Sequence, residues 1–341
     1  MAETMRQWTL ETIGRERLAL TTTPIPRPAP GEILVKVSAT SLNYRDKLVI
    51  ETGMGLPLKF PFVPASDMAG IVESLGVGVT RFKPGDRVIS TFAPGWIDGL
   101  NQGTARVPPY KTLGGFYPGV LSEYLAFPED WLSPAPSSLD DGEASALPCA
   151  GLTAWFALVE RGALRLGQTV VVHGTGGVAL FGLQIAKAHG AEVIVVSGSD
   201  DKLAKAKALG AAHGINRNTE NWVEAVHRLT GDRGADHIVE TVGGAHLGRS
   251  IEAAAMGGRI SVIGVLDGFE VSGPVGPLML KGLTVQGMSV GHRRALEDLV
   301  RAVDRLKLKP VIDARYALMD LPRALEHLDR GPFGKIVVEM R

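Results

Sequence analysis

The sequence contains only one cysteine, Cys149, among 341 residues. A single cysteine cannot form an intrachain disulfide or a cysteine-rich zinc site, and it is typical of a protein in a reducing compartment. An excess of charge of one sign is also missing, because 36 Lys and Arg residues balance 36 Asp and Glu residues. This balance argues against nucleic acid or an anionic membrane surface as the main partner.

Long hydrophobic runs are missing as well. No stretch approaches the ~18 uninterrupted apolar residues that a membrane-spanning helix needs, and the first residues lack the apolar centre of a signal peptide. We therefore expect a cytoplasmic protein with no membrane partner. Glycine, in contrast, is abundant at 42 of 341 residues, against a usual share of ~7%.

Residues 1–126 read as short strands between glycine and proline turns. Stretches rich in β-forming residues predict strands at 33–40, 69–76 and 86–90, which indicates a compact and mostly antiparallel β unit. The segment 91–120 is rich in glycine, proline and aromatic residues. A loop of this length inside a compact domain is usually functional or mobile, and we expect it to form a wall or lid over an apolar pocket, or an ordered surface crossing.

From about residue 145, strands alternate with helices. Apolar stretches predict strands at 169–177, 192–199, 212–216, 236–244, 259–265 and 283–288. Segments with helical spacing lie between them, at 178–190, 200–210, 221–231 and 245–258. This alternation predicts an α/β fold with a doubly wound parallel sheet of the Rossmann type. An amphipathic helix at 293–306 and a final helix and strand follow.

A glycine fingerprint marks the first strand–helix junction of this region. Gly174-Thr175-Gly176-Gly177-Val178-Ala179 matches the pattern G-x-G-x-x-A. In this pattern the first glycine makes a tight turn, the second lets the backbone approach a pyrophosphate, and the last small residue keeps the helix close to the sheet. A strand–helix turn can need glycine without any ligand, but the alternation that follows favours a dinucleotide cofactor.

The end of the second strand bears on which dinucleotide binds. An acidic residue at this place would bind the ribose 2′-hydroxyl of NAD, whereas this strand ends in Ser197-Gly198-Ser199. Both serines can bond a phosphate, and Lys202 and Arg217 can add positive charge. Asp200 and Asp201 oppose this interpretation unless they point away, and Lys202 alone is equally consistent with a solvated helix face. NADPH is therefore favoured over NADH.

The order of these parts resembles the medium-chain dehydrogenase/reductase superfamily over essentially the whole chain. Its shared motifs match Ala69–Glu73, Pro84–Val88, Ala150–Ala154, the glycine fingerprint and Gly334–Val337. Within it, the chain is most similar to the zinc-free quinone oxidoreductases and the zinc-type alcohol dehydrogenase-like proteins. The resemblance implies a GroES-like catalytic domain formed by residues 1–126 and 292–341, and a Rossmann cofactor domain formed by residues 127–291.

The departures from the zinc enzymes of this superfamily concern the metal. Their catalytic zinc is held by Cys, His and Cys, and the matching positions here are Asn43, Ser66 and Cys149. One thiol with an amide and a hydroxyl is not a zinc site, and the 91–120 segment has none of the four cysteines of the structural-zinc lobe. We therefore predict no metal, and we interpret Cys149 as a small buried residue behind the nicotinamide. The eight histidines form no metal-like cluster in the sequence.

The resemblance also implies roles for individual residues. Asn43 would bond the cofactor near the nicotinamide, Tyr44 would line the substrate side or donate a proton, and Thr153 would lie beside the nicotinamide. Tyr44 could equally pack under the cleft, Thr153 could bond its own helix, and Asp46 is more structural than catalytic. The full set of expected cofactor contacts is Asn43, Thr153, Gly174, Thr175, Gly176, Gly177, Val178, Ser197, Ser199, Lys202, Arg217, Gly243, Gly264, Val265, Leu266, Ser289, Gly291 and Lys335, the last with a salt bridge as its alternative role.

Three functions remain open at this point. The leading one is metal-independent transfer of hydride from NADPH to a quinone or an α,β-unsaturated carbonyl, since such apolar acceptors are electrophilic without a Lewis acid. The second is a zinc-independent alcohol dehydrogenase or carbonyl reductase. The third is an NADPH-binding protein with a structural or RNA-binding role, which the zero net charge does not support. The resemblance further implies a homodimer that pairs the strand at 283–288 across a two-fold axis.

Overall fold

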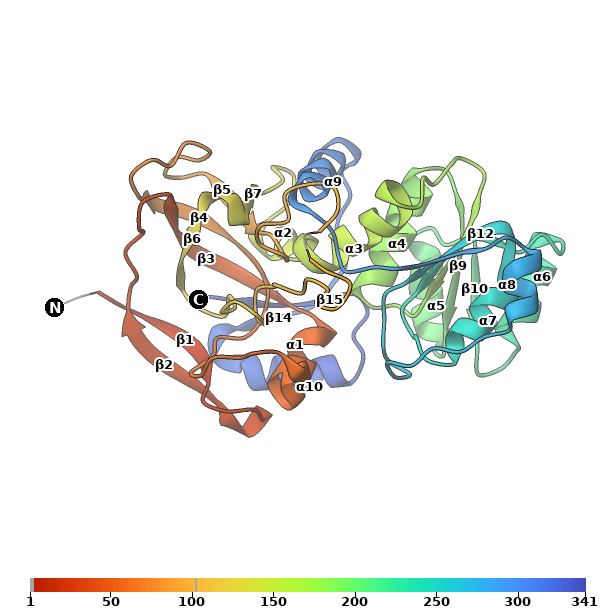
Figure 1. The fold of residues 1–341 in the computed structure, drawn as a ribbon, viewed down its shortest axis with the longest axis horizontal. Helices are drawn as coiled ribbons and strands as arrows, with labels where there is room; N and C mark the ends of the chain where they lie inside the picture. The colour runs from red at the N-terminus through yellow and green to blue at the C-terminus, as the bar shows by residue number, and fades with distance from the viewer. Residues whose placement is uncertain (1–2, 102) are drawn as a thin grey trace. The chain divides into compact units, whose positions relative to one another are not determined.

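The structure, a computed structural model, describes residues 3–101 and 103–341 (Figure 1). The chain forms two compact units. Unit 1 consists of Met1–Leu152 with Gly291–Arg341, and unit 2 consists of Thr153–Val290. Across the described residues, no helix combines the length and the apolar character required to cross a bilayer.

The main sheet of unit 1 is built around one long strand, β3, which pairs antiparallel with β4, β6 and β15. Six of its strands run in the order β14-β15-β3-β4-β5-β7, and a separate antiparallel hairpin, β1 with β2, lies outside it. The strands are β1 (Thr4–Leu10), β2 (Leu18–Pro24), β3 (Glu32–Leu42), β4 (Asp67–Leu75), β5 (Arg87–Ser90), β6 (Tyr124–Pro128), β7 (Leu132–Pro134), β14 (Ile312–Ala317) and β15 (Lys335–Glu339).

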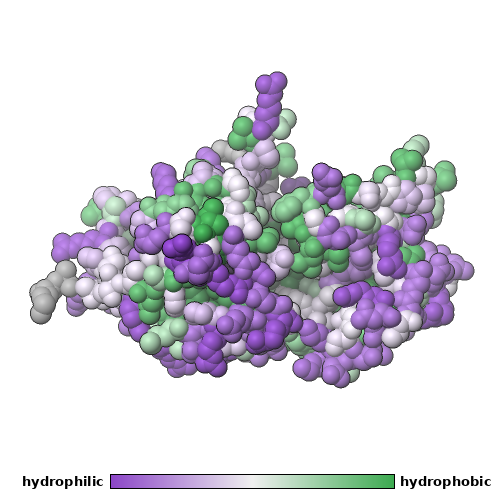
Figure 2. Space-filling model, turned by 90° about the horizontal axis from the view of Figure 1, so that it is seen from below, coloured by the Kyte–Doolittle hydropathy of each residue, from purple (hydrophilic) through white to green (hydrophobic). Residues whose placement is uncertain are grey.

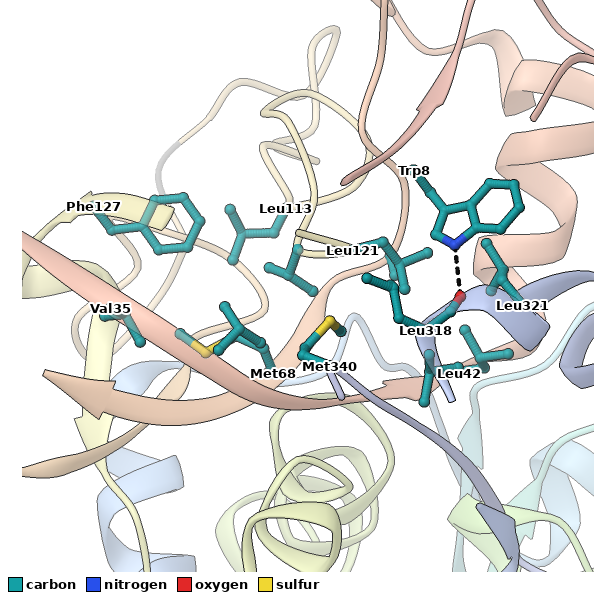
Figure 3. Close-up of a cluster of buried hydrophobic side chains, with 14 of the residues drawn as sticks. Trp8, Val35, Leu42, Met68, Leu113, Leu121, Phe127, Leu318, Leu321 and Met340 are labelled. Carbon is teal, nitrogen blue, oxygen red and sulfur yellow. Dashed lines mark hydrogen bonds between the residues drawn. The ribbon is translucent and has the colours of Figure 1, made fainter. Parts of the chain in front are cut away.

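Short helices connect and cover these strands. They are α1 (Tyr44–Thr52), α2 (Asp141–Ala144), α9 (Arg293–Leu306) and α10 (Leu321–Asp329), with the 3₁₀ turns η1 (Arg15–Arg17), η2 (Gly53–Gly55), η3 (Glu129–Trp131) and η6 (Leu318–Asp320) and the π-helical turn η4 (Leu147–Gly151). Apolar residues from the sheet and from α10 form one core (Figure 3). In this core the Trp8 indole N–H donates to the Leu318 carbonyl at 2.8 Å, so the one polar atom of the ring is satisfied.

Unit 2 contains the predicted doubly wound sheet. Its six strands run in the order β10-β9-β8-β11-β12-β13, and each neighbouring pair is parallel. The strands are β8 (Thr169–His173), β9 (Glu192–Ser197), β10 (His213–Asn216), β11 (Ala235–Glu240), β12 (Ala254–Val262) and β13 (Thr284–Gly287). The strand order reverses between β8 and β11, and open α/β sheets bind ligands at such a reversal, beyond the carboxyl ends of the strands.

The helices of unit 2 follow the strands in alternation. They are α4 (Gly177–Ala188), α5 (Asp200–Ala208), α6 (Trp222–Thr230), α7 (His246–Ala253) and α8 (Val275–Leu280), preceded by the short α3 (Leu152–Trp155) and the π-helical turn η5 (Phe156–Glu160). Trp222, at the start of α6, is fully buried in the apolar cluster that the sheet forms with α6 and α7. The predicted fold class is therefore confirmed.

Two predicted boundaries are wrong. Unit 1 continues to Leu152 rather than ending at residue 126, because β7 pairs with β5 and the Arg87 guanidinium bonds both Asp141, at 2.6 Å, and the Leu139 carbonyl. The helix expected over 245–258 ends at Ala253, and Ala254 already begins β12. Gly257 in that strand has a φ of +70°, a conformation that interrupts a helix and that glycine adopts without strain.

The surface in Figure 2 is mainly hydrophilic, with apolar residues gathered in separate groups. In unit 2, exposed apolar side chains are concentrated in and around α8 and the segment that precedes it. They are Leu266, Phe269, Val271, Val275, Met279 and Leu280. Exposed apolar side chains that lie close together in the chain mark candidate contact surfaces.

Candidate active site

The glycine fingerprint forms the turn that the sequence predicts. β8 ends at His173 and α4 begins at Gly177. Gly174 has a φ of +80°, which disfavours any other residue, and its N–H donates to the Val196 carbonyl at 2.7 Å. A Cβ placed on Gly176 would meet nothing within 4 Å, so the space over the turn is open. A helix of twelve residues thus starts beneath open space, and its first N–H groups have no partner inside the helix and favour an anion.

Two further turns follow β11 and β12, and their glycines pack against each other's backbone. A Cβ on Gly243 would lie 2.4 Å from the Gly264 carbonyl oxygen, and a Cβ on Gly264 would lie 1.6 Å from the Thr241 carbonyl oxygen. Only glycine allows these approaches. The structure therefore brings together Gly243, Gly264 and the adjoining Val265 and Leu266, at the strand ends where the sequence analysis places a cofactor.

The end of β9 has the features expected for a phosphate. The Arg217 N–H donates to the Ser197 carbonyl at 3.0 Å, and a Cβ on Gly198 would lie 3.2 Å from the Arg217 guanidinium. Ser199 caps α5 by accepting from the Lys202 N–H at 3.4 Å. Asp200 is turned toward Asn216, whose amide donates to it at 2.7 Å. Ser197, Ser199, Lys202 and Arg217 therefore belong to the turns at the ends of β9 and β10 and to the start of α5, and the Asp200 carboxylate is bonded to Asn216.

A group that the sequence analysis missed lies behind the glycine turns. His173, Glu240 and His246 place their ligating atoms within 4.8 Å of one another, the one such group among the described residues. Burial disfavours the charged form of His173 and lowers its pKa to about 3. Burial raises the pKa of Glu240, but the hydrogen bond from His246 and the nearby imidazoles outweigh it and bring it to about 2. A carboxylate at the end of an apolar strand was the available signal, because such residues are rarely buried without a partner.

In unit 1, the residues at the family's metal positions form a hydrogen-bonded chain. Asn43 Oδ1 accepts from the Lys335 ammonium at 2.5 Å, and the same ammonium donates to the Leu42 carbonyl at 2.6 Å. The Asn43 amide N–H lies 3.5 Å from Ser66 Oγ, and the Ser66 hydroxyl donates to Asp67 at 2.6 Å. All four side chains of Asn43, Ser66, Asp67 and Lys335 are buried. Asn43 and Lys335 therefore meet, as the sequence analysis places both near one site.

The donor set at these positions does not suit zinc. The Asn43 oxygen is bonded to an ammonium and the Ser66 hydroxyl to a carboxylate, which leaves one thiol as a soft ligand. Cys149 is half-buried as a residue, rather than fully buried as expected, although its thiol is enclosed by the protein. Burial of the thiol and the charge of Asp67 raise the pKa of Cys149, so the protonated form prevails. Burial also raises the pKa of Asp67, although Lys335 and Ser66 lower it in part.

Arg45 attaches the 91–120 segment to α1. Its guanidinium donates to the Tyr110 hydroxyl at 2.9 Å, to the Leu113 carbonyl at 3.0 Å and to Thr112, and it lies over the Phe92 ring at 5.0 Å. Leu113 and Phe92 are buried. Arg45 thus holds the segment near both of its ends, whereas Leu100 and Val107 in its middle remain largely exposed.

The remaining predicted residues lie as follows. Tyr44 begins α1 and is 43% exposed, with the Lys47 ammonium 6.0 Å from its ring centre. Its ring is therefore not part of the apolar core of unit 1. Asp46 is structural, as expected, because its carboxylate accepts the Asn43 N–H at 2.8 Å at the start of α1. Thr153 is buried in α3, Ser289 is exposed beyond β13, and Gly291 begins the return of the chain to unit 1.

Comparison with known proteins gives consistent matches. Residues 29–137 match the family described as the alcohol dehydrogenase GroES-like domain, and residues 177–305 match the family described as zinc-binding dehydrogenase. A zinc-type alcohol dehydrogenase-like protein of Schizosaccharomyces pombe is 36% identical over 91% of both chains. The quinone oxidoreductase of Rattus norvegicus is 28% identical over 92% of this chain and 91% of its own. A crystal structure from Sinorhizobium meliloti 1021 that carries an alcohol dehydrogenase name is 68% identical over the whole of both chains, with a TM-score of 0.97.

Proposed function

The chain belongs to the medium-chain dehydrogenase/reductase superfamily of oxidoreductases, and from this premise we propose a metal-independent NADPH-dependent reductase. Its acceptor is a quinone or an α,β-unsaturated carbonyl. When bound, the nicotinamide cofactor supplies the hydride, and the protein supplies orientation and exclusion of water. The observation that carries the proposal is the open glycine turn between β8 and α4, together with a β9 end that holds serines and arginine.

Unit 2 offers residues that could bind the pyrophosphate of the cofactor and residues that could line the rest of its site. Gly174–Val178 and the start of α4 would hold the pyrophosphate, because backbone N–H groups and a helix N-terminus favour its charge. The turns at Gly243 and Gly264–Leu266 would line the remainder of the crevice, with Thr153 and Ser289 as further contacts.

The preference for NADPH rests on charge at the end of β9. A 2′-phosphate would be repelled by a carboxylate that points toward it, but the Asp200 carboxylate is turned toward the Asn216 amide at 2.7 Å. The Ser197 and Ser199 hydroxyls can donate to phosphate oxygens, and the exposed Arg217 can bind them in a bidentate manner. NADH offers these groups no partner, so it should bind more weakly.

The donor set of unit 1 supports metal independence. With Asn43 bonded to Lys335 and Ser66 bonded to Asp67, no two soft ligands accompany Cys149. An acceptor that is electrophilic by itself tolerates the loss of a Lewis acid better than a simple ketone does. Tyr44, exposed and hydroxyl-bearing, is the candidate to donate a proton or hydrogen bond to the reduced acceptor.

The second candidate function is a zinc-independent alcohol dehydrogenase or carbonyl reductase. It is favoured by the alcohol dehydrogenase name of the Sinorhizobium meliloti protein that is 68% identical. The two candidates differ in acceptor, since an alcohol dehydrogenase should reduce simple aldehydes and ketones and should oxidise alcohols with NADP⁺.

We also propose a homodimer. β13 is an edge strand of the unit 2 sheet, and exposed apolar side chains such as Met279 and Leu280 lie just before it in the chain. An unpaired edge next to apolar surface favours pairing with a second copy. Light scattering coupled to size exclusion tests this proposal, and a monomer at micromolar concentration contradicts it.

The function is tested by cofactor titration followed by a substrate panel. We expect NADPH to bind more tightly than NADH, and we expect NADPH oxidation with 1,4-quinones and enones to exceed that with simple ketones. Tight NADPH binding with no turnover on any acceptor would instead favour a binding protein. Turnover restricted to alcohols and simple carbonyls would favour the second candidate.

A further inference from the structure

One carboxylate lies behind the predicted cofactor crevice of unit 2. Glu240 is the last residue of β11 and is fully buried. Its Oε1 accepts from the Val242 N–H at 2.8 Å and from the Gly243 N–H at 3.2 Å. Its Oε2 accepts from the His246 imidazole at 2.8 Å and from the Ser250 hydroxyl. Four donors therefore hold the carboxylate, and two of them belong to the turn that follows β11.

Glu240 and the next residue, Thr241, also bond the other two turns of the crevice. The Glu240 carbonyl accepts from the Ile263 N–H at 2.8 Å and from the Gly264 N–H at 3.2 Å, in the turn after β12. The Thr241 hydroxyl donates to the His173 carbonyl at 2.9 Å, where the glycine fingerprint begins. Glu240 and Thr241 thus connect all three turns that the proposed function assigns to the cofactor.

We propose that Glu240 is the positioning residue of the cofactor crevice, whose carboxylate holds the turn at Val242–Gly243 in its binding conformation. This inference rests on the proposed function, because it assigns the turns to a dinucleotide. His246 and Ser250 lie one helical turn apart on α7 and therefore present their donors on one face. They fix the second carboxylate oxygen, which leaves the first free to accept the two backbone N–H groups. Glu240 itself touches no reacting atom.

The full hydrogen-bond complement distinguishes this role from metal binding. Two imidazoles and a carboxylate are a set that transition metals accept. However, both oxygens of Glu240 already accept two hydrogen bonds each, and the His246 nitrogen is one of the donors. His173 Nε2, buried without a hydrogen-bond partner, lies 4.0 Å from the carboxylate and bonds neither oxygen. A metal ion bound here would have to displace the hydrogen bond between His246 and Glu240. Positioning of the turn by Glu240 requires no change in any of its four hydrogen bonds.

The test compares Glu240→Ala with Glu240→Gln, and uses Glu192→Ala as a matched control. Glu192 also bonds a histidine, His213, at 2.9 Å in the same unit, but it is exposed and lies at the start of β9, away from the three turns. The dissociation constant of NADPH is measured by calorimetry below the unfolding transition of every variant. Hydrogen exchange of residues 242–244 and 263–266 is followed in the absence of cofactor.

We expect Glu240→Ala to weaken NADPH binding by about tenfold or more, because two backbone donors lose a charged acceptor. Its exchange at 242–244 should be faster, and the KM of the acceptor should stay unchanged. The Gln variant keeps a carbonyl oxygen for Val242 and Gly243 and should bind within about threefold of wild type. Glu192→Ala should match wild type.

Three results would overturn the inference. They are a Glu240→Ala protein that is less stable yet binds NADPH normally, a Gln variant as weak as the Ala variant, and stoichiometric binding of added Zn²⁺ that depends on Glu240. If Glu240→Ala does not fold, Ser250→Ala, which removes one donor, should show the same faster exchange at 242–244. A wild-type protein that binds neither NADPH nor NADH would instead refute the proposed function.

Discussion

The ammonium of Lys335 lies 2.5 Å from Oδ1 of Asn43, although 291 residues separate them in the chain. Both side chains are buried, and the Lys335 ammonium is close enough to two buried carboxylates, Asp46 and Asp67, to interact with them electrostatically. Lys335 lowers the pKa of each carboxyl and so favours its charged form. Lys335 thus supplies a buried positive charge next to Asn43 and near both carboxylates.

Replacing this lysine should destabilise unit 1. Lys335→Met leaves the buried Asp67 without the positive charge that lowers its pKa, whereas Asp46 keeps Arg45, and leaving a buried charge uncompensated costs about 3–5 kcal/mol. We expect the free energy of unfolding of unit 1, measured in urea, to fall by about 3 kcal/mol. The control Lys36→Met removes an exposed lysine of β3 and should stay within about 0.5 kcal/mol of wild type. Equal stability of the two variants would contradict the role of Lys335.

The preference for NADPH should depend on Arg217. Arg217→Ser removes the guanidinium next to Gly198, and the loss of one charge-assisted contact to a phosphate corresponds to about a tenfold weakening. We expect the dissociation constant for NADPH to rise by that factor while the constant for NADH stays within about twofold. Arg228→Ser, on α6 with its guanidinium 2.9 Å from Glu220, is the control. An equal loss of affinity for NADPH and NADH would mean that Arg217 supports the fold and does not bind the 2′-phosphate.

Asp46 should make stability depend on pH. Burial, and secondarily the charge of Asp67, raise its pKa from 3.8 to about 6 against the opposing effect of Arg45. Because the folded value is the higher one, this group stabilises the fold fully below pH 3.8 and loses that contribution as the pH rises through about 6.

Asp46→Asn resembles the protonated form at every pH. Its stability relative to wild type should therefore rise between about pH 4 and 7.5, by up to about 3 kcal/mol for a shift of this size. Urea unfolding of both proteins across this range measures the difference. A difference that does not change with pH would show that Asp46 ionises normally in the folded protein.

Arg45 should control the order of the 91–120 segment. Arg45→Met keeps the length of the side chain but removes its donors to Tyr110, Thr112 and Leu113, and we expect about 2 kcal/mol of lost stability. Limited proteolysis should become faster near the exposed middle of the segment, around Val107. Arg106→Met, an exposed change within the same segment, should leave the cleavage rate unaltered. Unchanged proteolysis of the Arg45 variant would show that apolar packing alone holds the segment.

The purified protein should contain no stoichiometric zinc. We expect elemental analysis to find far less than one zinc per chain, and we expect a chelator to leave NADPH oxidation unchanged, since Cys149 has no second soft ligand. One zinc per chain that leaves together with the activity would contradict this expectation.

The doubly wound sheet could be predicted from the sequence because its signals are local. Strands such as 192–199 are apolar and end at glycines or serines, and each helix follows within a few residues. The glycine fingerprint could be predicted for the same reason, since the φ of +80° at Gly174 is required by the geometry of a single turn.

The parts that escaped prediction depend on contacts between distant segments. The extension of unit 1 to Leu152 follows from the pairing of β7 with β5. No local sequence pattern predicts this pairing. Glu240, His246 and His173 come from three different strand ends or helices, so their meeting is a result of strand order. The exposure of Cys149 likewise depends on how η4 packs.

The path of the chain has a consequence for synthesis. Unit 2 is one continuous stretch, Thr153–Val290, whereas β15 lies between β14 and β3 in the sheet of unit 1. On the ribosome, all of unit 2 emerges before residues 335–339 do. Unit 2 can therefore fold during translation, while residues 39–42 of β3, the part that pairs with β15, stay unpaired on that edge until β15, and with it Lys335, has been synthesised. In this order of assembly, residues 39–42 of β3 form an exposed strand edge, which favours pairing with other chains until β15 covers it.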